Sequence, residues 1–428
     1  MNVLMFGWEF PPNISGGLGT ACHGIVKGLS TFDDIHVVFV IPKAHGNEQI
    51  NKYQLISADQ VDIECKSPSP VQHPVFIKVL EVPSALSPYL NPESYSRKLI
   101  QTEKKGEISQ HGKRIYFSGK YGPNLYDEIN NYAIVAKTIA EENEFQLIHA
   151  HDWLTFPAAI AAKKASGAPL ILHIHSTDFD RSGGSVNPTI FRIEKQGMEE
   201  ADRIITVSNL IKKRLISQYN ISPEKITTVY NAIDPVPEKK KTVKHSGKIK
   251  TVTFLGRITI QKGPAYFAEV ARLIHKKMKN VRFIMAGNGE LRDQIVECCA
   301  KYRISNRFHF TGFLCGDEVS EILNKSDVFI MPSVSEPFGI VPLEAMQANV
   351  PVIISLQSGI AEVIRSAVKA DFWDIHAMAD AVHGILKYKK LSKTMINDGK
   401  KELGKLNWVS TASQIRQIYL NTIPKLVS

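Results

Sequence analysis

The chain has 428 residues, of which 43% are hydrophobic and 22% are charged. At about 150 residues per domain this length predicts two or three domains, and the apolar content excludes a mainly disordered chain. The 52 basic residues outnumber the 42 acidic ones and give a net charge of +10, which favours an anionic ligand.

In the N-terminal half, short apolar runs predict strands, and amphipathic stretches separate them after residue 150. The predicted strands are Val3–Phe6, Ile35–Ile41, Val75–Leu80, Gln146–His149, Leu170–Ile174, Arg203–Val207 and Ile226–Val229. The predicted helices are Ala21–Leu29, Phe156–Ser166, Asn187–Glu200 and Asn209–Gln218. The alternation of strand and helix predicts a parallel sheet with right-handed crossovers.

The C-terminal half repeats this alternation. The predicted strands are Thr251–Leu255, Val281–Ala286, Arg307–Phe310, Val328–Met331 and Val350–Ile354. The predicted helices are Pro264–Met278, Leu291–Tyr302, Glu318–Asn324, Ile340–Ala348 and Ala377–Lys390. A second parallel sheet is therefore expected.

Two prolines and a basic run at residues 234–250 separate the halves, as expected of a linker. We predict an α/β protein of two Rossmann-like, doubly wound parallel-sheet domains facing a cleft, at residues 1–235 and 236–405. Residues 406–428 contain a helical pattern, Trp408–Ile423, that could pack on either domain. Residues 83–124 break the alternation and form a candidate acceptor-side loop.

Several expectations concern location and partners. The five cysteines are odd in number and lack a CxxC pair, which disfavours a disulfide framework and fits a reducing cytoplasm. The N-terminal apolar stretch is too short for a signal peptide, and no apolar run reaches the roughly 18 residues that span a bilayer. The basic run at 238–250 has no aromatic residues, so we interpret it as a solvated linker and expect no nucleic-acid partner. The oligomeric state stays open.

A glycine-rich loop, Ser15–Thr20, follows the first predicted strand and precedes a helix. Glycines let the backbone approach a ligand, and a helix N-terminus offers free N–H groups to an anion. The loop is not GxGxxG, because Cys22 stands where the third glycine would fall. A plain glycine turn is an equally good interpretation of this loop taken alone.

Histidines and aspartates follow two of the predicted strands, in HAHDW (149–153) and HIHSTDFDR (173–181). Alternation places His149 and His151 on one side if the strand continues. A metal pair is possible, but no third ligand lies at helical spacing, so we expect no metal site here. Two polar strand ends on one sheet edge instead favour a sugar-sized polar pocket, although single aspartates there are usually loop caps.

Charged residues also follow two strands of the second half. Arg257 and Lys262 come after its first strand; Arg offers a bidentate fork for phosphate and Lys a point charge. Glu336 lies in a loop after a later strand, and Glu344 lies in the helix that follows. The amides between them suit a phosphate, whereas two carboxylates could also be a glycosidase acid pair.

Together these motifs resemble a known family. The E-x7-E spacing of Glu336 and Glu344 is similar to that of retaining glycosyltransferases with the GT-B fold, and Arg257 and Lys262 resemble their phosphate-binding pair. The segments that look like the glycogen/starch synthase branch are GGLG (16–19), HAHDW (149–153), HSTD (175–178) and YNAID (230–234). The motifs lie in order from residue 16 to residue 344, so the resemblance covers most of the chain.

The resemblance implies a retaining transferase that moves a hexose, glucose above all, from UDP-glucose or ADP-glucose to a glycan acceptor such as an α-glucan, without a metal or other cofactor. It implies His151, Glu336, Arg257 and Lys262 as catalytic residues. It implies a donor site of Gly16, Gly17, Arg257, Lys262, Phe338, Gly339, Ile340 and Glu344. His175 and Asp178 are expected on the acceptor or sugar side.

Two positions depart from the family pattern, since Ile14 stands where a lysine is usual and Thr20 where an aspartate is frequent. These departures leave open a polysaccharide or glycolipid acceptor. A non-catalytic glycan- or nucleotide-binding protein on the same fold and a nucleotide-sugar epimerase are further alternatives. A dehydrogenase would need GxGxxG directly after the first strand, which this chain lacks.

Overall fold

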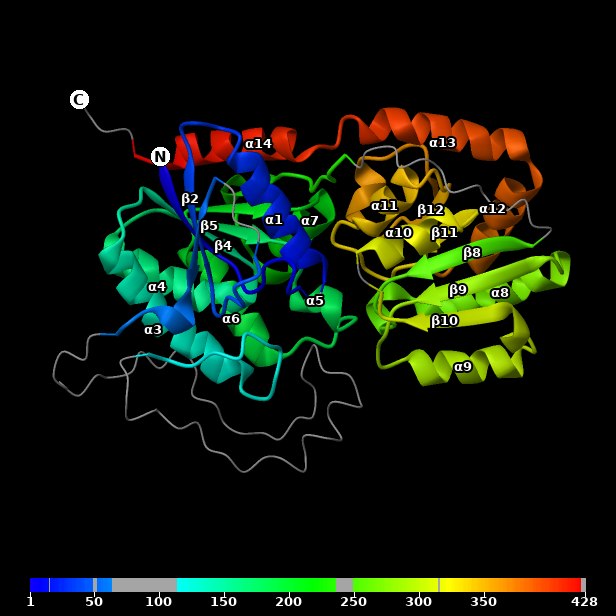
Figure 1. Cartoon of the computed structure of the whole chain (residues 1–428), viewed down its shortest axis with the longest axis horizontal. Helices are drawn as coiled ribbons and strands as arrows, with labels where there is room; N and C mark the ends of the chain where they lie inside the picture. The colour runs from blue at the N-terminus through cyan, green and yellow to red at the C-terminus, as the bar shows by residue number, and fades with distance from the viewer. Residues whose placement is uncertain (15, 49–51, 64–113, 236–248, 315, 425–428) are drawn as a thin grey trace.

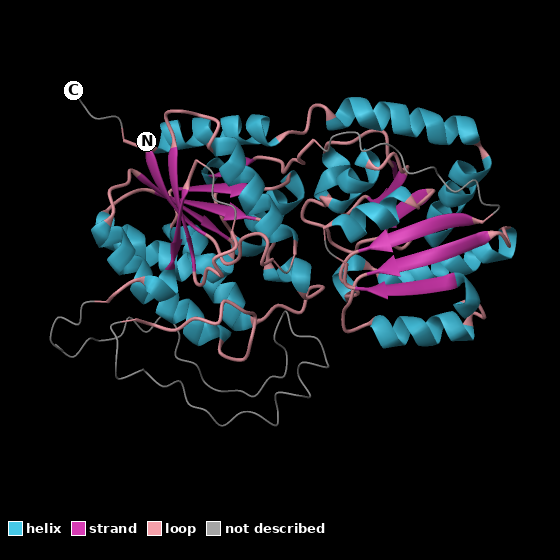
Figure 2. Ribbon diagram, in the orientation of Figure 1, coloured by secondary structure: helices cyan, strands magenta, loops and turns pink. Residues whose placement is uncertain are grey.

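The computed structural model describes residues 1–428 except 15, 49–51, 64–113, 236–248, 315 and 425–428. Two α/β domains lie side by side, each built on a parallel sheet with helices on both faces (Figures 1 and 2). This architecture confirms the predicted fold class. The predicted strand Val75–Leu80, and most of the irregular segment at 83–124, lie outside the described residues.

Within the described residues, the N-terminal sheet has seven strands in the order β3-β2-β1-β4-β5-β6-β7, all paired in parallel. They are β1 Asn2–Phe6, β2 His36–Ile41, β3 Gln54–Ser57, β4 Leu147–His151, β5 Leu170–Ile174, β6 Arg203–Thr206 and β7 Ile226–Thr228. The helices are α1 Gly17–Leu29, α3 Leu125–Glu142, α4 Phe156–Ser166, α5 Asp178–Arg181, α6 Pro188–Glu200 and α7 Asn209–Tyr219. The sequence pattern missed β3, α3 and the short α5.

In the part of the C-terminal domain that the structure describes, the sheet has six parallel strands in the order β10-β9-β8-β11-β12-β13. They are β8 Lys250–Leu255, β9 Val281–Ala286, β10 Phe308–Gly312, β11 Val328–Met331, β12 Val352–Ser355 and β13 Val368–Ala370. The helices are α8 Pro264–Lys277, α9 Arg292–Lys301, α10 Asp317–Asn324, α11 Val341–Gln347, α12 Ile375–Lys387 and α13 Lys389–Leu403. Here β13 and α13 were not predicted.

The last helix, α14 (Trp408–Thr422), leaves the C-terminal domain and lies along α1 of the N-terminal domain (Figure 1). Two glycines of α1 allow this approach. A Cβ on Gly24 would lie 2.1 Å from the Trp408 ring, and one on Gly28 would lie 2.4 Å from the Trp408 carbonyl. Trp408 and Tyr419 are buried there, so α14 completes the core on this face of the N-terminal sheet.

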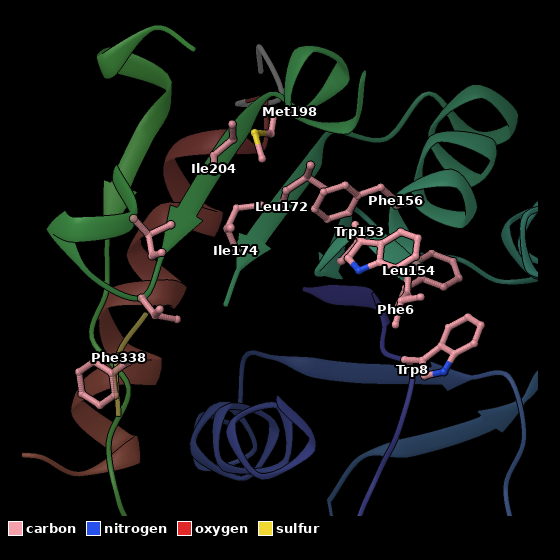
Figure 3. Close-up of a cluster of buried hydrophobic side chains, with 14 of the residues drawn as sticks. Phe6, Trp8, Trp153, Leu154, Phe156, Leu172, Ile174, Met198, Ile204 and Phe338 are labelled. Atoms are coloured by element: carbon pink, nitrogen blue, oxygen red, sulfur yellow. The ribbon is translucent and has the colours of Figure 1, made fainter. Parts of the chain in front are cut away.

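A cluster of buried apolar side chains continues from the N-terminal domain into the C-terminal one. It includes Phe6, Trp153 and Leu172 on one side and Phe338 on the other (Figure 3). Apolar burial contributes about 25 cal/mol per Å², so this continuity holds the domains together. None of the described helices has the length and apolar character needed to cross a membrane.

Candidate active site

The strands β8, β9 and β10 point their carboxyl ends at the N-terminal domain (Figure 2). Ligands of open α/β sheets bind beyond the carboxyl ends of the strands. The loops that follow β8 and β11 therefore lie where a ligand between the domains would contact the C-terminal sheet.

The loop after β8 ends in a short 3-10 turn, η4 (Ile260–Lys262), that lies against the loop after β11. Gly263 follows it with φ +66°, and a Cβ there would lie 2.0 Å from the carbonyl oxygen of Pro332. Only glycine permits this approach. The carbonyl of Gln261 also accepts a hydrogen bond of 2.9 Å from the Val334 amide. The two loops are thus fixed to each other by their backbones.

Lys262 and Glu336 form an ion pair between these two loops. Both side chains are largely buried, and the Ser333 hydroxyl lies 3.5 Å from the same Glu336 oxygen. Arg257 lies in the first loop, and its guanidinium donates a 3.0 Å hydrogen bond to the buried Gln261. The structure therefore brings three of the four residues implied as catalytic to one place, at the edge of the C-terminal domain.

The loop from Glu336 to α11 turns sharply at Gly339, where φ is +105°. A Cβ at this position would lie 3.2 Å from both the Glu336 side chain and Ile360, so the turn packs tightly on the carboxylate. The amides of Phe338, Gly339 and Ile340 have no acceptor among the described residues. Backbone N–H groups left in this way can bind an anion.

Glu344 lies one turn into α11 and is half-buried. Burial raises the pKa of its carboxyl to about 7. The carboxyl therefore titrates near neutral pH and can bind hydroxyl groups as an acceptor once it is ionised.

Gly16 and Gly17 stand at the start of α1 and are exposed, and a Cβ on either would meet open space. Nearby, the buried carboxylate of Glu9 accepts the Gly19 amide at 3.3 Å. Acidic side chains are favourable at a helix N-terminus, so Glu9 fixes the glycine loop from within. The sequence interpretation missed Glu9, because a lone acid seven residues before a glycine pair carries no pattern.

His151 is the last residue of β4 and is fully buried. Its Nδ1 lies 3.0 Å from Nε2 of His175, which is 9% exposed. Asp152 follows with φ +59°, and its carboxylate accepts the His175 amide at 2.7 Å and the Ser176 amide at 3.3 Å. Burial raises the pKa of Asp152 to about 6. Asp152 thus ties together the two histidine-bearing strand ends.

The predicted sugar-side residue Asp178 lies in a buried polar network of the N-terminal domain. Its carboxylate accepts the Asn187 amide at 2.6 Å, and its own amide donates to Glu194 at 3.0 Å. Glu194 also binds Arg181 at 2.7 Å and the Tyr219 hydroxyl. Burial raises the pKa of Glu194 to about 7. These contacts place Asp178 in a loop-stabilising role, and contact with an acceptor stays a prediction.

Polar contacts join the two domains beside these loops. Ser208 donates a 2.6 Å hydrogen bond to the carbonyl of Pro337, and Glu362 accepts the amides of Asn209 and Leu210 at 2.9 and 2.8 Å. Glu362 thereby caps the N-terminus of α7 from the other domain. The Tyr230 hydroxyl also donates to Glu362 at 2.9 Å, so YNAID lies at the domain boundary.

Neither His151 nor His175 hydrogen-bonds to the described residues of the C-terminal domain. The implied site thus consists of two parts on separate domains. The C-terminal part carries Arg257, Lys262, Glu336 and Glu344, and the N-terminal part carries the glycine loop and the histidines. A basic pair beside backbone amides that have no acceptor among the described residues can bind an anionic ligand.

Comparison with known proteins identifies the family of the chain. Residues 15–236 match the family described as "Glycosyltransferase Family 4", and residues 235–402 match "Glycosyl transferases group 1". The chain belongs to the family 4 glycosyltransferases, with a group 1 C-terminal domain. It is 27% identical over 442 residues to an uncharacterized glycosyltransferase of Methanocaldococcus jannaschii, covering 98% of each chain.

More distant proteins share the full length. A glycogen synthase of Mycobacterium tuberculosis is 23% identical over 430 residues, covering 98% of this chain and 94% of the relative. The sucrose-phosphate synthase of Thermosynechococcus elongatus superposes with a TM-score of 0.72 at 18% identity, covering 98% of both chains. Anabaena HepE in complex with UDP-glucose gives a TM-score of 0.66 at 16% identity, covering 98% of this chain and all of that one. These structures share the GT-B fold.

Proposed function

We propose that this glycosyltransferase is a retaining hexosyltransferase that moves glucose from UDP-glucose or ADP-glucose to an α-glucan. The observation that carries the proposal is the ion pair of Lys262 with Glu336, beside Arg257, on two loops at the domain boundary. The glycogen synthase relative supports glucose and a glucan acceptor.

The basic pair would hold the donor diphosphate. Arg257 and Lys262 offer two fixed cations, and the amides of Phe338, Gly339 and Ile340 offer N–H groups at the neighbouring turn. Preorganised donors of this kind stabilise the charge that develops on a departing phosphate. Because these groups supply the positive charge, the proposed reaction uses no cofactor. Gly16 and Gly17 would approach the same diphosphate from the other domain.

The two carboxylates would bind the two ends of the donor. Glu344, in α11, would accept hydrogen bonds from the ribose hydroxyls. Glu336 would accept hydrogen bonds from hydroxyls of the donor sugar, in exchange for part of its contact with Lys262. This exchange would release the lysine towards the phosphate as the donor binds.

Transfer would follow a front-face displacement. The bond from the anomeric carbon to the phosphate oxygen breaks, the acceptor oxygen bonds to the same face, and its proton passes to the departing diphosphate. His151, held by His175, would lie beside the anomeric carbon and stabilise the oxocarbenium-like state. Closure of the domains would exclude water and favour transfer over hydrolysis.

A donor screen followed by product analysis tests the proposal. Thermal unfolding is measured with UDP-glucose, ADP-glucose and other nucleotide sugars, and transfer to glycogen is then followed by nucleotide release and linkage analysis. We expect one glucose donor to raise the unfolding midpoint and an α-linked glucan product. A product that forms only on lipid or oligosaccharide acceptors would show that the acceptor is not an α-glucan. Absence of transfer from every donor would contradict the proposed hexosyltransferase activity.

One test variant and one matched control variant complete that assay. Removing one electrostatic donor from an active site costs about 10²–10³-fold in turnover, so we expect a loss of this order for Lys262→Ala. Lys276→Ala, which changes an exposed lysine of α8, should keep the rate. A normal rate of transfer by Lys262→Ala would contradict the proposal that Lys262 holds the donor diphosphate.

A further inference from the structure

Arg214 of α7 contacts the loop of the C-terminal domain that carries Glu336. Its Nη1 group forms an ion pair with Asp180 of α5 and donates a 3.2 Å hydrogen bond to the hydroxyl of Ser335. The Ser335 hydroxyl itself donates to the same Asp180 oxygen at 2.6 Å. Both helices lie on the side of the N-terminal domain that faces the C-terminal one (Figure 1). We call Asp180, Arg214 and Ser335 the boundary network.

The boundary network is well shielded from water. Asp180 and Ser335 are buried, and the Arg214 side chain is 22% exposed. The second oxygen of Asp180 accepts the amide and the hydroxyl of Thr177, both at 2.8 Å, which fixes the carboxylate in α5. Hydrogen bonds to ionised groups in such surroundings are strong and directional. Asp180 and Arg214 therefore hold the Ser335 hydroxyl in one place.

Ser335 is also bound to the loop that carries Lys262. Its amide donates a 3.4 Å hydrogen bond to the carbonyl of Gln261. Gln261 directly precedes Lys262, and Ser335 directly precedes Glu336, so each is the neighbour of one member of the Lys262–Glu336 ion pair. A displacement of Ser335 would therefore move the backbone on which this ion pair is built.

The N-terminal domain also holds the Glu336 loop on its other side. Ser208, the N-cap of α7, donates a 2.6 Å hydrogen bond to the carbonyl of Pro337. A Cβ on Gly359 would lie 2.5 Å from that of Ser208, and the Gly359 amide donates to the Glu336 carbonyl at 2.9 Å. Helix α7 thus contacts the chain on both sides of Glu336, through Arg214 before it and Ser208 after it.

We propose that Arg214 is a positioning residue for glycosyl transfer, which holds Ser335, and through it the Glu336 carboxylate, while the two domains are together. The inference rests on the proposed function, because Glu336 is the carboxylate proposed to bind the donor sugar. When the domains separate, Ser335 loses both Asp180 and Arg214. Glu336 would therefore take its position for transfer only in the closed arrangement, in which water is excluded.

Kinetics of Arg214→Met in the full-length protein test the proposal, with the donor and the acceptor that the donor screen identifies. Methionine keeps an apolar stem and removes the guanidinium. We expect kcat to fall by about 10- to 100-fold, because misplacement of a contacting group by about 1 Å can cost about 10²-fold. Hydrolysis of the donor should rise relative to transfer, since the closed arrangement is weakened.

Two readouts separate positioning from a structural role. Binding of UDP or ADP should stay close to that of the wild type, because these ligands have no sugar to contact Glu336. The assay is run well below the unfolding midpoint of the variant, where a loss of stability alone changes neither kcat nor the ratio of hydrolysis to transfer. Normal values of both in Arg214→Met would overturn the proposal.

Two further variants of α7 complete the kinetic test. Lys213→Met, at the neighbouring exposed position, is the matched control and should keep the wild-type kcat and ratio. Arg214→Lys keeps a positive charge near Asp180 and should recover part of kcat, although lysine lacks the planar fork of arginine. An equal loss in Lys213→Met would show that the effect does not come from the boundary network and would overturn the proposal.

Hydrogen–deuterium exchange distinguishes failure of this inference from failure of the proposed function, because it needs no activity. The amides of Ser335 and Glu336 are hydrogen-bonded to the carbonyls of Gln261 and Gln357. They should exchange faster in Arg214→Met than in the wild type or Lys213→Met. A wild type without transfer would contradict the proposed function, and exchange would still decide whether Arg214 holds the loop. Unchanged exchange at residues 335 and 336 would overturn the positioning role whatever the activity.

Discussion

The hydroxyl of Ser335 donates a hydrogen bond of 2.6 Å to Asp180 across the boundary between the two domains. Asp180 is fully buried and also forms an ion pair with Arg214 of its own domain. Ser335 directly precedes Glu336, so this contact ties the proposed sugar-binding carboxylate to the end of the HSTDFDR segment.

Ser335→Ala should destabilise the protein through this contact. A hydrogen bond to a charged group contributes about 1.5–3 kcal/mol, and Asp180 keeps only its intradomain partners in the variant. The free energy of unfolding, measured by denaturant titration, should fall by that order. Ser217→Ala, at an exposed site on α7, serves as the matched control and should stay within about 0.5 kcal/mol of the parent. Equal stability of the two variants would show that the interdomain bond does not hold in solution.

Donor binding should depend on pH through Glu344. Burial raises its pKa to about 7, whereas a glutamate in an unfolded chain titrates near about 4.3. Its contribution to the free energy of unfolding is therefore full below about pH 4 and is lost as the pH rises through about 7. Ribose hydroxyls donate hydrogen bonds to the ionised carboxylate of Glu344. The affinity for the donor should therefore rise as the pH rises through about 7.

Calorimetric titration of UDP-glucose or ADP-glucose checks this dependence, since neither donor has a phosphate that titrates near neutral pH. Affinity should rise from pH 6 to pH 8 by up to about tenfold, the equivalent of one pKa unit. Glu344→Gln should bind with the same affinity at both pH values. The carboxyls of Asp152 and Glu194, with pKa values raised to about 6 and about 7, still titrate in that variant. If donor affinity still depends on pH in Glu344→Gln, the dependence comes from these two groups.

The packing of α14 on α1 predicts opposite effects for two glycine-to-alanine changes in helices. A Cβ on Gly24 would lie 2.1 Å from the Trp408 ring, and overpacking of this kind costs about 1–3 kcal/mol. On Gly384 of α12 the nearest atom would be 3.9 Å away, so alanine should stabilise by about 0.5–1 kcal/mol. Thermal unfolding of both variants measures the difference. Stabilisation by Gly24→Ala would show that α14 does not lie on α1 in solution.

The sequence predicts the two parallel sheets because their buried strands are apolar runs separated by amphipathic helices. Ser208 as the cap of α7, and strand ends rich in histidine, could also be predicted from local pattern. The pattern missed α3, which follows a segment of weak periodicity, and β3, which is only four residues long.

Contacts between segments that are far apart in the chain could not be predicted from local sequence patterns. His173 lies beside His151 through the register of β5 on β4, and Asp180 meets Ser335 through the arrangement of two domains. Glu362 was missed for the same reason, since its partners in α7 are more than 150 residues away. The role of such residues depends on tertiary geometry, and no spacing rule encodes it.

The central claim is that Arg257 and Lys262 hold a diphosphate at the boundary between the domains. Calorimetric titration of the nucleoside diphosphate against the matching monophosphate, UDP against UMP and ADP against AMP, tests it most directly. The wild-type protein should bind the diphosphate of its own nucleoside at least about tenfold more tightly, since charged hydrogen bonds contribute about 1.5–3 kcal/mol each. The double variant Arg257→Ala, Lys262→Ala should lose this preference and keep its binding of the monophosphate. Equal binding of diphosphate and monophosphate by the wild type, or an unchanged preference in the double variant, would contradict the claim.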